Sequence, residues 1–413
     1  MNEQLLKQCT LAKQASRQMK TMLTSSKNQA LKSISNHLKL HVADIIKENQ
    51  KDIDHAIELG MADAMIDRLL LNEERILAMA DDVAKLIDLE DPVGNIIREI
   101  KRPNGLLIQQ VRIPIGVFGI IYESRPNVTV DIASLCIKSG NVCILKGGKE
   151  AIHSNRILTK LMQEAIKDIL PIHCVQLIDY GGREMADELI HAYGYIDVAV
   201  PRGGTELIQH VVQNASVPVI ETGAGNCHLY IDSQADMKKA IDISANAKIQ
   251  RPSVCNAIET ILVHKDIAQT YLPLLKEAFQ NQVEIRGDQQ VQRIISCQPA
   301  VEEDYMKEYD DYIVAVKIVH SLDEAIEHIY QYSTHHSESI ITENQETANI
   351  FLDKVDSACV YHNASTRFSD GGQFGFGAEL GISTQKLHAR GPLGLLEMTS
   401  YQYKIFGQGQ IRK

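Results

Sequence analysis

From residue 113 onward, the chain alternates short apolar runs with segments of helical periodicity, and no other feature constrains the fold as strongly. Such runs between turn residues are typical of buried strands, whereas apolar residues three and four positions apart are typical of helices. Strands that alternate with helices form a parallel sheet covered on both faces. The first series has predicted strands at Ile115–Tyr122, Val142–Leu145, Val175–Ile178, Val198–Val200 and Val217–Ile220, and helices at Val130–Ser139, Ile152–Ile169 and Thr205–Gln213.

A second series of the same kind follows, so the sequence predicts two α/β domains one after the other. The 413 residues agree with this prediction, since a domain has roughly 150 residues. The residues before position 90 carry apolar side chains at helical spacing. The second series has strands at Ala257–Val263, Ile313–Val319, Ser339–Ile341 and Ala358–Tyr361, and helices at Ile267–Gln280, Leu322–Tyr332 and Glu346–Val355.

Two further segments look like strands without helical partners. Ile96–Val111 contains the turn sequence Arg102-Pro103-Asn104-Gly105, which predicts a hairpin. The tail, Thr399–Lys413, reads as one extended strand. A hairpin with unpaired edges promotes aggregation unless it is covered. We therefore expect hairpin and tail to form a small sheet across a subunit boundary in a homo-oligomer.

Composition excludes several classes of protein. The net charge of −11 opposes binding to phosphate backbones, and the absence of Trp leaves few side chains for stacking on bases. The longest apolar run, Ile113–Ile121, is far shorter than the ~20 residues that span a bilayer. We therefore expect neither a nucleic-acid partner nor a membrane. The eight cysteines are scattered without metal-ligand spacing, and Met1–Met22 lacks an apolar signal segment, which indicates no metal site and a cytoplasmic, reducing location.

Three glycine-rich loops are candidates for binding phosphate. Lys146-Gly147-Gly148-Lys149 and Arg202-Gly203-Gly204-Thr205 each follow a predicted strand and precede a helix, and Gly371–Gly377 lies late in the chain. The amides at a helix N-terminus attract anions. None of the loops matches a dinucleotide or Walker signature, and tight turns between strand and helix are the alternative. Two such loops in the same domain, both with basic residues, favour a nucleotide.

Cys255 is the candidate nucleophile. It lies in a polar loop before an apolar strand, and Arg251 nearby favours the thiolate. A thiolate attacks carbonyl carbon and forms a thioester, which hydride reduces or another nucleophile releases. The alternative is a buried cysteine that acts only as a small apolar side chain.

These residues resemble the aldehyde dehydrogenase superfamily, and within it the gamma-glutamyl phosphate reductases (glutamate-5-semialdehyde dehydrogenases). The order of Asn127, Lys146, the segment 221–226 and Cys255 is similar to that of the superfamily. The closer resemblance covers essentially the whole chain. It rests on Tyr122-Glu123-Ser124-Arg125-Pro126-Asn127-Val128, on Ser253-Val254-Cys255-Asn256-Ala257-Ile258-Glu259-Thr260 and on Phe376-Gly377-Ala378-Glu379-Leu380-Gly381-Ile382-Ser383-Thr384.

The resemblance implies a function. The enzyme would reduce L-glutamyl 5-phosphate with NADPH to L-glutamate 5-semialdehyde and phosphate, the second step of proline biosynthesis. Cys255 would carry the glutamyl group as a thioester, and Asn127 would donate its side-chain amide to the oxyanion together with the Cys255 N–H. Such donors stabilise a transition state by ~3 kcal/mol. Functional coupling to glutamate 5-kinase, which makes the labile substrate, would follow.

The resemblance also implies a cofactor site. Lys146 would bind the adenosine ribose hydroxyls, and Arg202, Gly203 and Gly204 would approach the pyrophosphate. Relatives that prefer NAD often carry a glutamate three residues after that lysine, whereas this chain has Lys149. A cation suits a 2′-phosphate, so NADPH is the expected cofactor. Glu308 would lie near the nicotinamide ribose, although the residues after it depart from the superfamily's pattern.

The alternatives concern how the thioester is released. Glu221 occupies the position of the glutamate that activates water in hydrolytic aldehyde dehydrogenases. The second interpretation is therefore a hydrolytic aldehyde dehydrogenase that oxidises a small acidic semialdehyde. A reductase has no use for that water, and Glu221 would then only line the site. Arg125, Arg251 and Arg367 are candidates for binding the substrate's carboxylate and phosphate. A non-catalytic nucleotide-binding protein with a buried Cys255 is the third reading.

The expected fold is therefore aldehyde dehydrogenase-like, with two Rossmann-like α/β domains and a small oligomerisation hairpin. The NADP-binding domain would comprise residues 1–97 and 112–224, and the catalytic domain residues 225–392, with Cys255 in the cleft between the two. Hairpin and tail would comprise residues 98–111 and 393–413.

Overall fold

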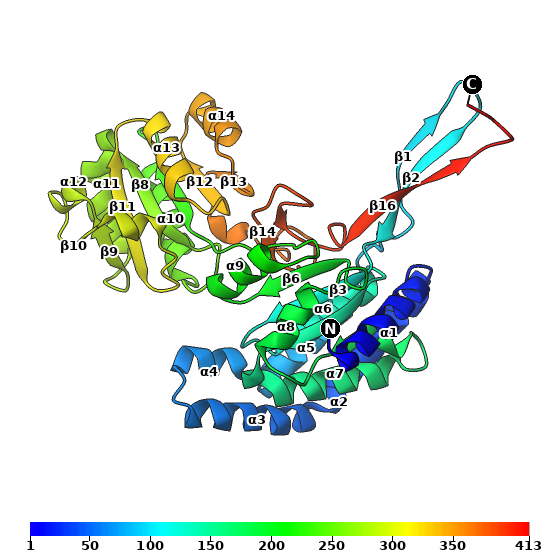
Figure 1. The fold of residues 1–413 in the computed structure, drawn as a ribbon. Coiled ribbons are helices and arrows are strands. Elements are labelled where there is room, and N and C mark those ends of the chain that lie inside the picture. The colour runs from blue at the N-terminus through cyan, green and yellow to red at the C-terminus, as the bar shows by residue number, and fades with distance from the viewer. Residues whose placement is uncertain (413) are drawn as a thin grey trace. The chain divides into compact units, whose positions relative to one another are not determined.

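The structure is a computed structural model that describes residues 1–412, and the chain divides into two compact units (Figure 1). Unit 1 comprises Met1–Thr222, Gly375–Gly381 and Leu393–Lys413. Unit 2 comprises Gly223–Phe374 and Ile382–Pro392. Each unit contains one parallel sheet, as the two series of strands and helices predict.

The N-terminal part of unit 1 consists of helices, as the helical spacing of its apolar residues predicts. Their buried faces are largely apolar, for example Ile76, Met79, Ala80 and Val83 on α5. Asn2 and Asn72 cap α1 and α5 by accepting backbone N–H groups of the first turn. The helices are α1 (Glu3–Met19), α2 (Thr24–Leu40), α3 (Val42–Glu58), α4 (Asp63–Leu69) and α5 (Glu73–Lys85).

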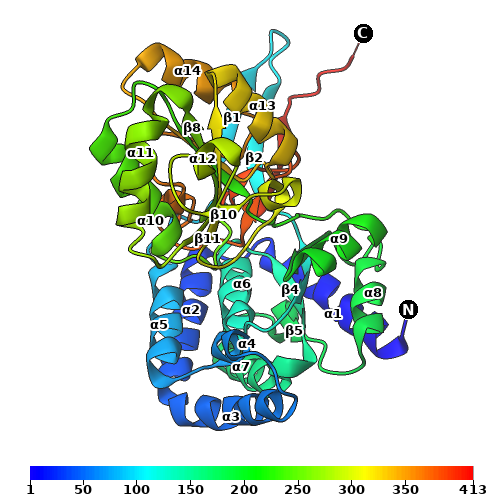
Figure 2. The same ribbon diagram turned by 90° about the vertical axis from the view of Figure 1, so that its left-hand side faces the viewer.

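The parallel sheet of unit 1 has the strand order β5-β4-β3-β6. Helices α6 and α7 pack on one of its faces, and α1 and α8 pack on the other (Figure 2). Its strands are β3 (Val117–Tyr122), β4 (Val142–Gly147), β5 (Val175–Leu177) and β6 (Val198–Arg202). The helices that follow β3 are α6 (Asn127–Lys138), η1 (Lys149–Ala151), α7 (Ile152–Ile166), η2 (Ile172–Cys174), α8 (Arg183–Ile190) and α9 (Thr205–Asn214).

The predicted strand Val217–Ile220 is wrong. Only an isolated bridge between Ala199 and Val219 is formed there. The Ala199 N–H donates to the Pro218 carbonyl, and the Ile220 N–H donates to the Ala199 carbonyl. Pro218 has no N–H to donate, so the pairing does not extend into a strand.

Unit 2 contains a seven-stranded parallel sheet of order β10-β9-β11-β8-β7-β12-β13. The sequence did not predict β7, α10 or β9. The strands are β7 (Cys227–Ile231), β8 (Ile258–His264), β9 (Glu284–Gly287), β10 (Gln298–Pro299), β11 (Ile313–Val319), β12 (Ser337–Ile341) and β13 (Cys359–His362). The helices are α10 (Met237–Ile249), α11 (Lys265–Ala278), α12 (Gln289–Gln292), η3 (Glu302–Met306), α13 (Leu322–Tyr332), α14 (Gln345–Lys354) and η4 (Thr366–Phe368). A two-stranded pair, β14 (Ile382–Ser383) and β15 (Gly391–Pro392), completes the unit.

The predicted hairpin and tail form a three-stranded antiparallel sheet in unit 1, drawn as cyan and red arrows in Figure 1. The hairpin strands are β1 (Ile96–Lys101) and β2 (Leu107–Pro114), and the Gly105 N–H donates to the Arg102 carbonyl across the predicted turn. The tail strand β16 (Thr399–Phe406) pairs with β2. The prediction of one strand from Thr399 to Lys413 is wrong beyond Phe406, where glycines 407 and 409 follow; Lys413 itself lies outside the described residues.

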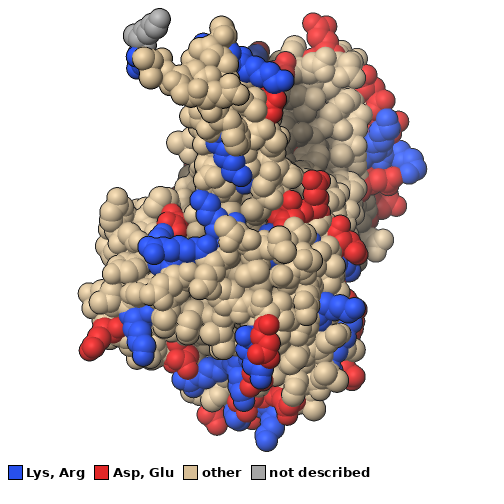
Figure 3. All heavy atoms as spheres, turned by 90° about the vertical axis from the view of Figure 1, so that its right-hand side faces the viewer, with Lys and Arg blue, Asp and Glu red and all other residues tan. Residues whose placement is uncertain are grey.

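Charged side chains of both signs are interspersed on the face drawn in Figure 3. Together with the net charge of −11, this mixture gives little long-range attraction for a polyanion. Among residues 1–412, no helix is both long enough and apolar enough to cross a membrane.

Candidate active site

Three loops of unit 1, those that follow β3, β4 and β6, meet at the carboxyl edge of its sheet. In the strand register, Tyr122 is opposite both Gly147 and Arg202, and Ile121 is opposite Lys146. The Gly148 N–H donates to the Tyr122 carbonyl, and this bond ties two of the loops together. Ligands of α/β proteins bind at this edge of a parallel sheet, so the topology places the predicted residues where binding is expected.

The loop after β3 has a strained backbone held by a carboxylate. Ser124 is buried and has φ of 46°, in the left-handed region that side chains other than glycine rarely adopt. Its N–H and its Oγ both donate to Glu150 Oε1, at 2.7 and 3.0 Å. Glu150 lies in η1, so the segment that follows Lys146 also sets the shape of the loop that leads to Asn127.

Asn127 is the first residue of α6, and its side chain is exposed. Its Nδ2 donates to Asp131 Oδ2 at 2.8 Å, one helical turn further on. Asp131 is half-buried, and burial raises the pKa of its carboxyl to about 6. The amide that the sequence assigned to the oxyanion thus has a defined orientation, which sequence reasoning did not foresee.

Lys146 fits a polar ligand. It lies near the end of β4 with 6% of its surface exposed, and burial lowers the pKa of its ammonium. In the part of the chain that the structure describes, this ammonium has no hydrogen-bonding or ion-pairing partner. A nearly buried ammonium without a partner is costly, and ligand hydroxyls would satisfy it. Lys149, at the start of η1, is exposed and adds a second cation beside it.

The loop after β6 differs from the prediction in one respect. Glu123 Oε2 accepts the Gly204 N–H at 3.2 Å, at the N-terminus of α9. A cofactor pyrophosphate at Gly203 and Gly204 would therefore compete with a carboxylate of the same chain. Arg202 lies against Gly381, where a Cβ would come within 2.6 Å of its Nη1.

In unit 2, Cys255 lies half-buried in a turn between α10 and β8. The Cys227 thiol donates to the Cys255 carbonyl at 3.2 Å, and burial raises the pKa of Cys227, so that this group stays a thiol. Gly225 packs so closely that a Cβ there would overlap the Cys255 carbonyl oxygen. The backbone of the candidate nucleophile is thus held from two sides, and only glycine fits at position 225.

Two guanidinium groups accompany Cys255. Burial and the neighbouring Arg251 lower the pKa of Arg367, while Cys255 acts on it in the opposite direction. Gln250 Oε1 accepts from Arg367 Nε at 3.1 Å, and Asn256 Nδ2 donates to the Ser369 carbonyl at 2.8 Å. The structure therefore brings Arg251, Arg367 and Cys255 together, an arrangement that stabilises a thiolate and attracts anions.

Glu308 makes a contact within unit 2 that the resemblance did not imply. Its Oε1 accepts the Gly225 N–H at 2.7 Å, and burial raises the pKa of its carboxyl. Glu308 therefore supports the loop that packs against Cys255. Of the other predicted residues, Arg125 is exposed in the loop after β3, and Glu221 is half-buried near the end of the first segment of unit 1.

Sequence reasoning missed a buried polar network that begins beside Cys227. Cys227 Sγ lies 3.7 Å from His336 Nδ1, which is 2.8 Å from Ser337 Oγ. The network continues from Ser337 to Ser369 and Tyr361 through hydroxyl contacts of 2.5 and 2.7 Å. Its members come from four separate places in the chain, so no sequence motif signals it.

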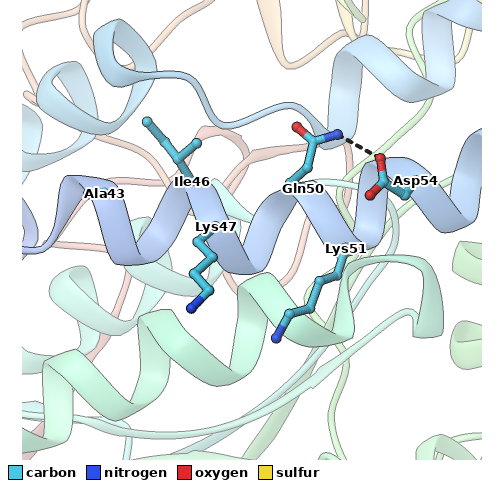
Figure 4. Close-up of a pocket in the computed structure, with 6 residues that line it drawn as sticks. All are labelled: Ala43, Ile46, Lys47, Gln50, Lys51 and Asp54. Carbon is cyan, nitrogen blue, oxygen red and sulfur yellow. Dashed lines mark hydrogen bonds between the residues drawn. The ribbon is translucent and has the colours of Figure 1, made fainter.

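Figure 4 shows a surface hollow of about 540 Å³ lined by residues of α3 alone, among them Lys47, Lys51 and Asp54. It contains none of the predicted site residues. Within residues 1–412, no group of three or more His, Cys, Asp or Glu side chains could hold a metal ion.

Comparison with known proteins gives consistent matches. The family model described as "Aldehyde dehydrogenase family" matches residues 2–317. The chain is similar to a gamma-glutamyl phosphate reductase of Petrotoga mobilis, with 54% identity, and to one of Halothermothrix orenii, with 52%; each match covers 100% of both chains. It is also similar to the crystal structure of gamma-glutamyl phosphate reductase from Thermotoga maritima, with a TM-score of 0.97, 46% identity and 100% of both chains covered.

Proposed function

The chain belongs to the aldehyde dehydrogenase family and, within it, to the gamma-glutamyl phosphate reductases, and from this premise we propose that it reduces L-glutamyl 5-phosphate to L-glutamate 5-semialdehyde and phosphate. This reaction is the second step of proline biosynthesis. The observation that carries the proposal within the molecule is the thiol of Cys255 beside the guanidinium groups of Arg251 and Arg367.

The first chemical step is acyl transfer to Cys255. The thiolate attacks the acyl carbon, the C–S bond forms, and the bond to the phosphate oxygen breaks, so that inorganic phosphate leaves and a thioester remains. Arg251 and Arg367 stabilise the thiolate and attract the anionic substrate. Arg125 is the third candidate for binding the anionic substrate. The Cys255 N–H and the Asn127 amide donate to the oxyanion that forms on the acyl oxygen.

Membership of the family implies a nicotinamide cofactor, which supplies hydride to the thioester carbon when bound. The collapse of the resulting thiohemiacetal releases the semialdehyde and returns the electron pair of the C–S bond to Cys255. We assign the ribose hydroxyls to Lys146 and a 2′-phosphate to Lys149, so that NADPH is preferred over NADH. Glu221 has no proton to move in this reaction and is proposed as a lining residue.

The function is tested in reverse, because the semialdehyde is easier to handle than the acyl phosphate. Purified protein receives glutamate semialdehyde and NADP⁺ with and without inorganic phosphate, and NADPH is followed by absorbance. NADPH that appears only with phosphate supports phosphorolysis of a thioester. Equal rates without phosphate would mean that water is the acceptor, and the hydrolytic dehydrogenase with Glu221 as base would replace the proposal. No NADPH in either arm would overturn both enzymatic readings.

We also propose that the sheet of β1, β2 and β16 joins two copies of the chain. Tyr401, Tyr403, Ile405 and Phe406 on β16 are each at least half exposed, an unusual density of apolar surface on one strand. Removal of residues 399–413 should lower the molecular mass measured by light scattering to that of a smaller assembly. An unchanged mass would contradict this assignment.

Location and coupling complete the proposal. The eight cysteines, all within residues 1–412, form no disulfide, which supports the proposed location in the reducing cytoplasm. Functional coupling to glutamate 5-kinase follows from the lability of the acyl phosphate. The test is a forward assay in which the kinase makes the acyl phosphate from glutamate and ATP. The yield of semialdehyde should be higher than when free acyl phosphate is supplied at the same rate.

A further inference from the structure

Asn127 alone does not determine which end of its side-chain amide faces the substrate. The NH₂ end donates two hydrogen bonds and the oxygen only accepts, so rotation by 180° replaces a donor with an acceptor. An oxyanion requires the donor. Because Asn127 is exposed at the start of α6, solvent would accept either orientation of its amide.

Asp131 removes this ambiguity. Its ionised carboxylate can only accept hydrogen bonds, so only the NH₂ end of Asn127 can face it, as the 2.8 Å contact from Nδ2 to Oδ2 requires. One N–H of Asn127 is thereby occupied, and the other N–H of the same nitrogen points elsewhere. Both residues lie on α6, four positions apart, so the helix keeps their spacing.

We propose that Asp131 is a positioning residue, which turns the amide of Asn127 so that its second N–H is presented to the oxyanion. The proposal rests on the proposed function, because it takes from it the role of Asn127. Asp131 does not touch substrate or cofactor in this assignment and acts only through Asn127.

The surroundings of Asp131 agree with such a role. Burial raises the pKa of its carboxyl to about 6, and Asp82 on α5 raises it further, whereas Asn127 and Arg202 at the end of β6 lower it. A half-buried carboxylate without a cation in direct contact costs stability at neutral pH. Within residues 1–412, the one hydrogen bond that the Asp131 carboxylate makes is with the Asn127 side chain.

The first experiment is a double-mutant cycle in the reverse assay with semialdehyde, phosphate and NADP⁺. Asp131→Ala should lower kcat about tenfold and leave all three KM values within about twofold, because an oxyanion donor acts in the transition state. In the Asn127→Ala background the same substitution should change kcat less than twofold, since its target is absent. An equal loss in both backgrounds would overturn the proposal, and so would no loss in either.

Asp131→Asn guards against misfolding, because it keeps the shape of the side chain. An amide at 131 satisfies either orientation of Asn127, so kcat should fall about threefold and lose its decline below pH 6. Asp131→Glu should recover part of the activity of Asp131→Ala. The matched control is Asp168→Asn, an exposed carboxylate after α7, which should leave kcat and its pH profile unchanged.

A second measurement separates the proposal from the proposed function. The side-chain ¹⁵N resonance of Asn127, assigned by its loss in Asn127→Ala, should shift with pH with a midpoint near 6 and stay constant in Asp131→Asn. A resonance that does not titrate in the wild type would overturn the pairing even in an active enzyme. A titrating resonance in a protein inactive on all these substrates would uphold the pairing and overturn the function.

Discussion

The two parallel sheets of this molecule present their candidate residues at opposite ends. In unit 1, Lys146 and Arg202 lie at the carboxyl ends of β4 and β6, and Asn127 begins the helix after β3. In unit 2, Cys255 lies before the amino end of β8, next to Cys227 at the amino end of β7. The first arrangement exposes loop amides and helix N-termini, and the second arrangement does not.

This difference corresponds to two ways of holding functional groups. In unit 1, single carboxylates hold individual residues at the edge of the sheet: Glu150 holds Ser124, and Asp131 holds Asn127. In unit 2, the buried polar network that begins beside Cys227 holds the backbone of Cys255, the candidate nucleophile. Under the proposed function, the carboxylates of unit 1 orient the groups that face the ligands, whereas the network of unit 2 fixes the backbone of the residue that would form the covalent intermediate.

The largest effect is expected at the thiol itself. Cys255→Ser should lower kcat at least about a thousandfold, because a hydroxyl is a far poorer nucleophile at neutral pH. The matched control is Cys297→Ser, which replaces the other half-buried cysteine of unit 2, whose thiol has a pKa raised by burial. It should retain full activity and leave one rapidly alkylated thiol, measured by mass spectrometry with iodoacetamide. Activity that survives in Cys255→Ser would remove the basis for covalent catalysis.

The second prediction concerns a buried hydrogen-bonded pair of unit 2, Lys248 and Glu259. Lys248 Nζ donates to Glu259 Oε2 at 2.6 Å, and both side chains are at most 1% exposed. Lys248→Met should destabilise the fold by about 3 kcal/mol, because an acid is left buried without its partner. The double variant Lys248→Met with Glu259→Met should recover most of that loss in denaturant unfolding. A loss no larger than that of the exposed variant Lys238→Met would show that this pair is unimportant to unit 2.

The pH dependence of that variant has a definite sign. Burial raises the pKa of Glu259 to about 8 in the folded protein, far above its value in the unfolded chain. The folded state therefore binds the proton more tightly, and stability is lost as pH rises toward the folded-state value. The free energy of unfolding that Lys248→Met loses relative to the wild type should therefore grow from pH 5 to pH 9. A deficit that shrinks over this range would contradict the assignment.

The same contrast explains what the sequence could predict. The hairpin was predictable because Arg102-Pro103-Asn104-Gly105 is a local turn signal, and the place of Cys255 in a loop before a strand because polar and apolar residues adjoin there. Helix α10 was missed because its buried residues are Ala240, Ser244, Ala247 and Lys248, which form no apolar stripe. Strand β9 was missed because Glu284–Gly287 contains a single large apolar residue.

The pairing of Asn127 with Asp131 was hidden by a boundary error. The predicted helix began at Val130, whereas α6 begins at Asn127, so the spacing of one helical turn was not visible.

The pairing of Glu338 with His228 across β12 and β7 depends on strand register, as does the bond from the His228 N–H to Glu338 at 2.6 Å. Contacts of that kind arise only when the sheet is assembled, and no local pattern encodes them.

The third prediction tests whether the exposed loops of unit 1 select the cofactor. Lys149→Glu should shift the ratio of kcat/KM for NADPH and NADH at least about tenfold toward NADH, about 1.4 kcal/mol, because a carboxylate repels a 2′-phosphate and accepts from a 2′-hydroxyl. Lys167→Glu, an equal change of charge at an exposed position at the end of α7, should leave the ratio unaltered. Equal ratios in the wild type and Lys149→Glu would exclude Lys149 from cofactor selection.

The smallest effect sharpens the comparison most, because it separates stability from function at one carboxylate of unit 1. The pKa of Asp131 is raised to about 6 in the folded state by burial, so its stabilising contribution is fully present below the unfolded pKa and is lost as pH rises toward 6. Asp131→Asn, which never ionises, should therefore raise the melting temperature by roughly 2–4 °C at pH 8, and the difference should vanish near pH 4. Calorimetry at the two pH values checks this, with Asp168→Asn as the control that should change neither melting temperature.

A variant that melts higher and turns over more slowly would mean that the ionised carboxylate is kept at the cost of stability, as expected for a residue that orients a functional group. If Asp131→Asn melts lower at pH 8, the hydrogen bond to Asn127 outweighs the cost of burying the charge, and Asp131 supports the fold of α6.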